Sequence, residues 1–351
     1  EVDAVLGTTS YGDILKAIRE AMEGKHFQEF KDIDYLPEKL GKRVLTTGGH
    51  FGYLKIAEGC DKHCTYCIIP KLRGKFRSVP MERLVTQAKE MAEEGVKELI
   101  LVAQETTVYG TDIYGKKSLH ILLKELCKIK GIRWIRVLYC YPEEIYDELI
   151  QTMKEEKKIC HYLDLPIQHA SDRILKRMGR RTTQAELVEI VNKLRREIPD
   201  IVLRTTLISG FPGETQEDHE ELMSFVDEME FDRLGVFTYS PEEDTPAATM
   251  PDQVAEEVKE ARRDEIMELQ QEISYDKGTD RIGQELLVMI EGKVADESAY
   301  IGRTYGDAPK VDGYIFVQTG ELLMTGDFAK VRVTGALEYD LIGELADEYT
   351  E

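Results

Sequence analysis

The sequence contains no hydrophobic run long enough to cross a membrane. None of its segments approaches the roughly 20 apolar residues that a membrane-spanning helix requires. The first 24 residues mix charged and apolar side chains without the apolar core of a signal peptide. We therefore expect a cytoplasmic protein with no membrane contact. Of the 351 residues, 42% are hydrophobic, which is enough to bury a sizeable core and to allow two or three domains.

Positive charge is also scarce. The chain has 46 lysines and arginines against 67 aspartates and glutamates, which gives a formal net charge of −21. A surface of this sign repels the phosphate backbone of RNA and DNA. The charge therefore disfavours nucleic acid as a partner, although a local basic groove would still permit it, and it favours a basic protein.

Cysteine is rare, and its distribution argues against a disulfide scaffold. Six cysteines in a chain of this length are far fewer than small secreted disulfide-rich domains contain. Three of them, Cys60, Cys64 and Cys67, fall within the segment AEGCDKHCTYCIIP, and no fourth cysteine lies nearby. In a reducing compartment such a cluster indicates metal binding. The open question is why only three thiols are present.

Short β-rich segments alternate with helical patterns from about Phe51 onward. This alternation predicts parallel β/α units. We expect about six strands, each followed by a helix or helical linker. The α/β fold would then be an incomplete (β/α)6 barrel of TIM type, with its chemistry at the C-terminal ends of the strands. The expected strands are 53–59, 98–104, 134–140, 161–168, 202–213 and 233–241, and the expected helices include 119–129, 143–155, 183–196 and 215–229.

The flanking segments do not follow this alternation. Residues 251–278 are highly charged and predict a long solvated helix stabilised by ion pairs four residues apart. The β-rich runs after this helix are separated by Gly, Asp and Pro, and they predict a small antiparallel β-barrel. Residues 1–45 contain no complete domain, and we interpret them as the remnant and linker of a truncated N-terminal domain. The expected division of the chain is 1–45, 46–250, 251–280 and 281–351.

The cysteine triad allows more than one kind of site. A zinc site with His63 as fourth ligand fits poorly, because structural zinc usually takes its ligands as two separated pairs. Three buried cysteines without a metal fit worse, since the residues between them are polar. A C-x3-C-x2-C loop can instead bind three irons of a [4Fe-4S] cluster. The fourth iron would then remain open to a substrate, which explains the missing ligand.

This loop, with an aromatic residue before the last cysteine and at the end of a first barrel strand, resembles the radical S-adenosylmethionine (SAM) superfamily. The resemblance implies that the open iron binds SAM and that one electron from the cluster cleaves SAM to a 5′-deoxyadenosyl radical. Beyond the triad, the chain from about residue 40 resembles the methylthiotransferases, and its C-terminal barrel resembles their TRAM domain. The segments that carry this likeness are CDKHCTYCIIPKLRGKFRSVP, DLPIQHASDRILKRMGRRT, TTLISGFPGET and FTYSPEEDTPAA.

The resemblance also implies roles for individual residues besides the three cysteines. Tyr66 would lie near the adenine of SAM, and Gln104 and Glu105 would bind its amino group. Arg204 would lie near the ribose and carboxylate, and Gly210 would form a tight turn after its strand. A strand-end Gln-Glu pair also serves as a helix cap or ion pair, and a glycine turn alone is a weak signal. Structural roles for these residues therefore stay open.

Two other residue types lie near the expected site. His169 follows the fourth expected strand, where it would either meet substrate or act as a structural histidine. The cysteines outside the triad, Cys127, Cys140 and Cys160, fit small buried hydrophobic positions, with Cys140 closest to the active face.

Within the methylthiotransferases, the segments PIQHAS, YSPEEDTPA and IGRTYGDAPKVDGYIFV resemble the RimO branch, which modifies a ribosomal protein, more than the transfer-RNA branch. Residues 284–351 contain five basic and fourteen acidic residues, a net charge of 5 − 14 = −9. An RNA-binding barrel is expected to be basic, whereas an acidic one suits a basic small-subunit ribosomal protein. The alternatives are a transfer-RNA methylthiotransferase and a zinc-stabilised, noncatalytic binding module.

The RimO resemblance implies addition of a methylthio group to the β-carbon of an aspartate. It also implies a second [4Fe-4S] cluster, held by three cysteines of an N-terminal domain, and an electron donor such as a flavodoxin or ferredoxin. Residues 1–59 contain no cysteine. We therefore expect the second cluster only in a longer protein, and the complete reaction of this chain is in doubt.

Overall fold

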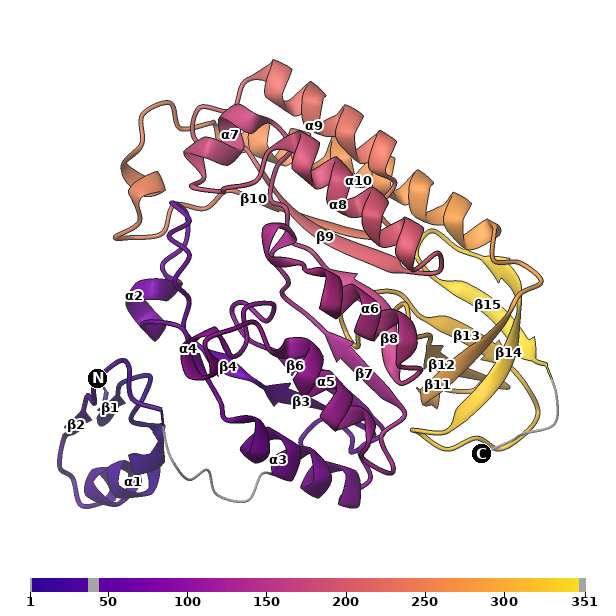
Figure 1. Cartoon of the computed structure of the whole chain (residues 1–351), viewed down its shortest axis with the longest axis horizontal. Helices are drawn as coiled ribbons and strands as arrows, with labels where there is room; N and C mark the ends of the chain where they lie inside the picture. Colours follow the sequence, from indigo (N-terminus) through magenta and orange to yellow (C-terminus); the bar gives the residue numbers. More distant parts are fainter. Residues whose placement is uncertain (1, 37–43, 347–351) are drawn as a thin grey trace.

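The computed structural model describes residues 2–36 and 44–346, and it contains two barrels joined by a long helix (Figure 1). Six parallel strands form the first barrel as one sheet in the order β10-β9-β8-β7-β6-β3. Neighbouring strands in this sheet are consecutive in the sequence when the short strands outside the sheet are left out. This order confirms the incomplete (β/α)6 barrel. The strands are β3 (Phe51–Lys55), β6 (Glu98–Val102), β7 (Trp134–Val137), β8 (Ile159–Asp164), β9 (Val202–Ser209) and β10 (Arg233–Thr238).

Helices connect these strands and cover the outer face of the sheet (Figure 1). The longer ones are α3 (Met81–Glu93), α5 (Leu119–Cys127), α6 (Asp147–Glu155), α8 (Gln184–Glu197) and α9 (Gln216–Met229). Capping boxes begin α8 at Thr183 and α9 at Thr215, since each threonine accepts from the backbone three residues later. Shorter elements are α2 (Ile69–Arg73), α4 (Thr111–Tyr114), α7 (Asp172–Arg177), η2 (Pro142–Glu144), η3 (Pro246–Thr249), β4 (Ala57–Glu58) and β5 (Arg77–Ser78).

Alternate residues of the strands enter two different cores. Leu99 and Leu101 pack among the side chains of the outer helices, whereas Ile100 between them belongs to a cluster inside the barrel. This period of two is the consequence of strand geometry. Because both faces are covered, four consecutive residues of β6, Leu99 to Val102, can be apolar.

The C-terminal barrel is closed and has five strands in the order β11-β12-β13-β15-β14. Four of its five pairings are antiparallel, as expected, but β13 and β15 are parallel. An odd number of strands cannot alternate in direction around a closed ring, so one pair has to be parallel. The strands are β11 (Glu285–Lys293), β12 (Ala299–Arg303), β13 (Ile315–Gln318), β14 (Phe328–Ala336) and β15 (Leu341–Leu345).

The loop 304–314 of the C-terminal barrel packs into the N-terminal half of the first barrel. Ala308 joins the interior cluster that contains Trp134 and Tyr162, and the Tyr162 hydroxyl donates to Asp312 at 2.8 Å. Arg233 donates to Asp307 at 2.6 Å. These buried contacts close the base of the first barrel, so the open end is the one that carries the C-terminal strand ends.

A second buried charge network crosses the same junction. Glu98 in β6 accepts from Arg136 in β7 at 2.8 Å and from Arg303 in β12 at 2.7 Å, and all three side chains are fully buried. Burial opposes ionisation of Glu98, but the two guanidinium groups hold its pKa below the usual value. The second barrel therefore supplies a positive charge, that of Arg303, which stabilises the buried carboxylate of Glu98 in the first barrel.

The connecting helix α10 (Glu256–Thr279) is not solvated on all sides, contrary to expectation. It packs against α9 and β10 and buries Lys259, Arg262 and Gln270. Lys259 reaches the carbonyl of Tyr239 at 2.8 Å, and Gln270 reaches that of Phe231 at 2.8 Å. Long polar side chains can bury their stems while their ends form hydrogen bonds, and for this reason hydrophobic periodicity alone misses the buried face.

No helix of the described residues, α10 included, is long and apolar enough to pass through a membrane.

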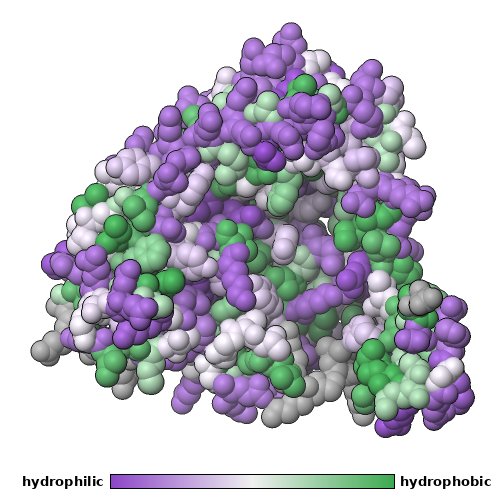
Figure 2. Space-filling view, turned by 180° about the vertical axis from the view of Figure 1, so that it is seen from behind, coloured by the Kyte–Doolittle hydropathy of each residue, from purple (hydrophilic) through white to green (hydrophobic). Residues whose placement is uncertain are grey.

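The N-terminal residues form a small β-α-β unit of β1 (Ala4–Leu6), η1 (Tyr11–Asp13), α1 (Ile14–Met22) and β2 (Phe27–Glu29), in which the two strands are parallel. Figure 2 shows hydrophobic side chains gathered on this unit at the lower right. Leu15 is 66% exposed and Met22 is 84% exposed. The sequence analysis expected no complete domain here, and the structure shows a unit too small to cover its own helix.

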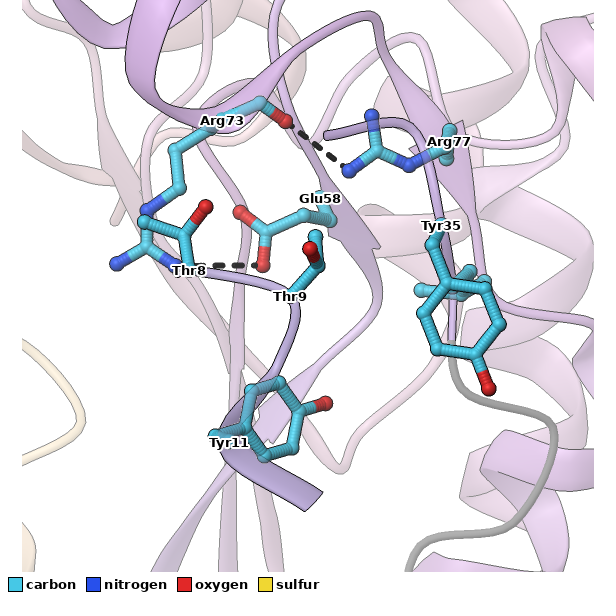
Figure 3. A pocket seen from close by; sticks show the side chains of 8 residues that line it. Thr8, Thr9, Tyr11, Tyr35, Glu58, Arg73 and Arg77 are labelled. Atoms are coloured by element: carbon cyan, nitrogen blue, oxygen red, sulfur yellow. Dashed lines mark hydrogen bonds and ion pairs between the residues drawn. The ribbon is translucent and has the colours of Figure 1, made fainter. Parts of the chain in front are cut away.

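The N-terminal unit contacts the segment that follows the cysteine triad. The Thr8 hydroxyl donates to the carbonyl of Leu72 at 3.0 Å, and Arg77 donates to Asp34 at 3.1 Å. A small pocket lies between the two parts (Figure 3) and is lined by Thr8, Thr9, Tyr11, Tyr35, Leu36, Glu58, Arg73 and Arg77. The unit thus lies beside the backbone that returns from the triad loop.

Candidate active site

The sequence-predicted site residues gather at the C-terminal ends of the parallel strands. The triad follows β3 and β4, Gln104 and Glu105 follow β6, and Gly210 follows β9. In an α/β barrel these strand ends form one face. Arg204 is the exception, because it lies within β9 and its guanidinium pairs with Asp164 and Asp312 inside the barrel.

Backbone contacts fix the shape of the triad loop. The Cys60 amide donates to the carbonyl of Gly74 at 3.2 Å, and the Thr65 amide donates to that of Met178 at 2.9 Å. Gly59 has a positive φ of 80°, and a Cβ there would lie 2.0 Å from the Lys75 carbonyl oxygen. Only glycine therefore permits the close approach between the start of the loop and the backbone at Lys75.

The three thiols lie in a partly buried environment. Cys60 and Cys64 are buried, and Cys67 is half-buried. Burial raises the pKa of Cys60 to about 11, and Glu105 and the other two thiols add to the effect. Burial also raises the pKa of Cys67. The thiols of Cys60 and Cys67 therefore stay protonated at neutral pH until a cation binds, and binding releases their protons.

The side chains of the described residues contain no group of three or more His, Cys, Asp or Glu that converges on a single ion. A four-iron cluster does not need such convergence, because each thiolate binds a different iron. His63, which a zinc site would use as its fourth ligand, is exposed. The donor set present here is three thiols on one short loop, which matches the requirement of a cluster with one open iron.

Tyr141 and Arg180 lie next to the triad. The Tyr141 hydroxyl is 3.4 Å from the sulfur of Cys64. The Arg180 guanidinium lies 4.3 Å from the centre of the Tyr141 ring, and its Nε atom is buried without a hydrogen-bond partner. A buried guanidinium with only part of its hydrogen bonds made is costly unless negative charge lies nearby. Three thiolates and a cluster would supply that charge.

Gln104 and Glu105 present unpartnered acceptors at the same face. Gln104 Oε1 and Glu105 Oε2 are buried without hydrogen-bond partners, whereas the other carboxylate oxygen of Glu105 accepts from the Thr107 amide at 3.0 Å. Burial raises the pKa of Glu105 to about 7. Two free acceptors suit the amino group of SAM, so the residues present fit both the cluster and its ligand.

Arg204 is already paired in the structure. Its Nη1 donates to Asp164 at 2.7 Å and to the Thr206 hydroxyl at 3.1 Å, and its Nε lies 3.3 Å from Asp312 of the C-terminal barrel. These contacts direct the guanidinium to the barrel interior. Its contact with SAM stays a prediction.

Gly210 and Tyr66 have structural partners at the open face. Gly210 has a φ of 72°, its amide donates to Glu214 at 2.8 Å, and a Cβ there would lie 2.2 Å from Cγ of Lys259. Tyr66 packs edge-on against Phe211 with ring centres 6.4 Å apart. The contacts of Gly210 and Tyr66 with SAM stay predictions.

His169 is fully buried. Its Nδ1 accepts from the Ser171 amide at 2.9 Å, and its Nε2 lies 3.6 Å from the carboxylate of Glu214. These contacts favour the structural interpretation of His169. Cys140 and Cys160 are buried and Cys127 is half-buried, as expected for small hydrophobic side chains.

Two family models match the chain. Residues 54–226 match the Radical SAM superfamily, and residues 282–346 match the TRAM domain. The first match contains the three cysteines and runs from within β3 to within α9, so β10 lies outside it. The second covers the closed five-stranded barrel.

Curated proteins give a closer comparison. A ribosomal protein uS12 methylthiotransferase RimO of Lachnoclostridium phytofermentans is 64% identical over 343 residues, which are 98% of this chain and 78% of that protein. The chain belongs to the RimO family. Another RimO, from Clostridium perfringens, is 53% identical over 350 residues, which are 99% of this chain and 78% of that protein.

Solved structures are less similar. A radical SAM methyltransferase, TsrM from Kitasatospora setae, has a TM-score of 0.47 and 17% identity, covering 56% of this chain and 38% of that one. A match at this level adds nothing to the assignment. Membership of the RimO family makes a [4Fe-4S] cluster and SAM the cofactors of this radical SAM methylthiotransferase, and the zinc-stabilised binding module finds no support.

The sequence analysis missed two neighbours of the triad, Tyr141 and Arg180. Tyr141 follows β7 at the same face as the other strand-end residues. The predicted order of the strands could therefore have placed it near the triad. Arg180 lies after α7 in a loop without such a signal, and only the fold brings it to Tyr141.

Proposed function

We propose that this radical SAM methylthiotransferase adds a methylthio group to the β-carbon of an aspartate in ribosomal protein uS12. The observation that carries the proposal is the 64% identity to a RimO named for uS12, over nearly the whole chain. A hydrogen on that carbon is too weakly acidic for a base of ordinary pKa. When bound, the cluster and SAM would supply radical chemistry, which can remove such a hydrogen.

The residues of this chain would prepare that step. Cys60, Cys64 and Cys67 would hold three irons, and Gln104 and Glu105 would accept the amino group of SAM. The closed base of the barrel excludes water from below, since Ala308 and Asp312 of the second barrel are buried there. Substrate would then enter only from the open face.

The charge of the C-terminal barrel supports a basic protein substrate. Some of its acidic residues, Asp307 and Asp312 among them, are buried against arginines of the first barrel and do not contribute to the surface. Among the described residues of β11 to β15 and their loops, six exposed acidic side chains still outnumber four exposed basic ones. These are Glu285, Asp296, Glu297, Glu321, Glu338 and Glu344 against Lys293, Lys310, Lys330 and Arg332.

The domain division 1–45, 46–250, 251–280 and 281–351 stays part of this proposal. The exposed apolar side chains of α1 support an N-terminal unit that packs against further protein, and the curated relatives are longer than this chain. A second [4Fe-4S] cluster would be held by that further protein. We also propose a flavodoxin or ferredoxin as electron donor and the cytoplasm as location.

Hydrogen abstraction can be tested without sulfur insertion. The reconstituted, reduced chain is incubated with SAM and with uS12 that carries deuterium only on its aspartate β-carbons. We expect deuterium in the 5′-deoxyadenosine, measured by mass spectrometry. The matched control is uS12 deuterated only in leucine, which should give unlabelled 5′-deoxyadenosine.

The outcome separates the proposed substrate from the transfer-RNA alternative. Unlabelled 5′-deoxyadenosine formed at the same rate with and without uS12 would contradict the proposal. Stimulation by transfer RNA alone would assign the chain to the other branch.

A further inference from the structure

Tyr141 is placed to donate a hydrogen bond to one of the cluster ligands. Its hydroxyl lies 3.4 Å from Cys64 Sγ, a distance suited to a hydrogen bond to sulfur. A cysteine that binds iron is a thiolate and has no proton to give, so the tyrosine must be the donor. Hydrogen bonds to cysteine sulfurs are among the factors that set the reduction potential of an iron-sulfur cluster.

Two cations lie against the ring of Tyr141. Lys62 Nζ is 5.0 Å from the ring centre, and Arg180 Cζ is 4.3 Å from it. Lys62 is neutralised in part, because it forms ion pairs with Glu143 at 3.4 Å and Glu144 at 2.5 Å. A cation over the ring withdraws electron density from the phenol and makes its hydroxyl a stronger donor.

Arg180 forms no direct ion pair among the described residues, although Glu143 attracts it over a longer distance. Its Nη2 donates to the carbonyl of Pro166 at 2.9 Å, and its Nε is buried with no acceptor. Only 7% of the residue is exposed. A positive charge at this depth acts over several ångströms with little screening.

We propose that Tyr141 and Arg180 are positioning residues that act through Cys64 to raise the reduction potential of the cluster. Reduction adds one electron to the cluster from an external one-electron donor, and the Tyr141 proton stays on its oxygen. The added negative charge strengthens the hydrogen bond and the attraction to Arg180. Both residues therefore stabilise the reduced form more than the oxidised form.

This inference rests on the cluster of the proposed function but not on its substrate. The potential can be measured by following the reduced cluster with electron paramagnetic resonance during a redox titration, without SAM and without uS12. A failure to methylthiolate uS12 would leave this measurement unchanged, so the two proposals can fail separately.

The first variant is Tyr141→Phe, compared at equal iron and sulfide content. We expect the ratio of reduced to oxidised cluster at a fixed potential to fall by about tenfold, which is about 59 mV for one electron. The matched control is Tyr146→Phe. Tyr146 also has a cation over its ring, Lys117 at 5.4 Å, and a hydroxyl contact, with His120 Nδ1 at 3.0 Å, but it does not contact the triad.

A pair of variants at Arg180 keeps the test decisive if Tyr141→Phe fails to assemble the cluster. Arg180→Gln removes the charge and should lower the ratio of reduced to oxidised cluster, as Tyr141→Phe does. Arg180→Lys keeps the charge, and its ratio should remain close to that of the unaltered chain. Potentials that are the same in Tyr141→Phe, Arg180→Gln and the unaltered chain would overturn the proposal. An equal loss in Tyr146→Phe would also overturn it, because the effect would then be one of packing.

Discussion

Glu105 shows how one side chain at the active site opposes the stability of the fold. It is only 1% exposed, and burial raises its pKa from the ordinary 4.5 to about 7. The contacts with Thr107 lower the pKa but do not cancel the effect of burial. Oε2 of Glu105 is buried without a hydrogen-bond partner. A cationic group such as the amino group of SAM would supply that partner.

This shift predicts a pH-dependent stability of the chain without bound SAM or cluster. Between about pH 4.5 and about pH 7 the folded chain keeps a proton that the unfolded chain has released, so stability falls as pH rises through this range. The loss should reach about 3 kcal/mol at about pH 8. Urea unfolding of Glu105→Gln, which keeps an oxygen acceptor for Thr107, should match the unaltered chain at low pH and exceed its stability at about pH 8. Parallel stability curves for the two proteins would contradict this.

At the same scale, sequence could predict the triad and not its neighbours. The spacing of Cys60, Cys64 and Cys67 is local, so one loop can carry the whole signal. Tyr141 and Arg180 meet only after β7 and α7 are placed around the barrel. Their contact depends on packing, which no local pattern records.

At the scale of elements, α10 and the loop 304–314 decide how the barrels are joined. The sequence indicated a solvated connector because α10 is rich in charge. The structure instead buries Arg262 against Glu214 at 2.9 Å and Lys259 against Gly210. The strands were predictable because short β-rich segments alternate with helical patterns. The buried face of α10 was not, because Lys259, Arg262 and Gln270 interrupt its apolar residues Ile266 and Ile273.

The junction predicts a large effect from one buried carboxylate of the loop. Asp307 is fully buried and pairs with Arg233 at 2.6 Å. Asp307→Asn should lower the free energy of unfolding by about 3 to 5 kcal/mol, because it leaves a buried guanidinium without its counter-charge. Glu285→Gln, which breaks the exposed pair with Arg332 in the same barrel, should cost less than about 1 kcal/mol. Chemical denaturation of both variants measures the difference, and equal small effects would show that the loop does not hold the junction.

At the scale of the whole molecule, one barrel offers an open face and the other closes its base. The alternation of strands and helices predicted the first barrel, and the turn-rich C-terminal third predicted the second. Their relative placement could not be predicted, because it depends on Arg136, Glu98 and Arg303, which lie far apart in the sequence and meet only in the folded chain. The cysteines that predict the cofactor are thus local in the sequence, whereas the residues that surround them are not.

The central claim is that this chain is a radical SAM enzyme whose cluster is held by Cys60, Cys64 and Cys67. The most direct measurement is 5′-deoxyadenosine formation from SAM by the reduced, reconstituted chain, assayed by chromatography beside Cys64→Ala and Cys127→Ala. We predict formation by the unaltered chain and by Cys127→Ala, whose thiol lies outside the loop, and none by Cys64→Ala. Undiminished 5′-deoxyadenosine from Cys64→Ala, or none from the unaltered chain with a complete cluster, would contradict the account.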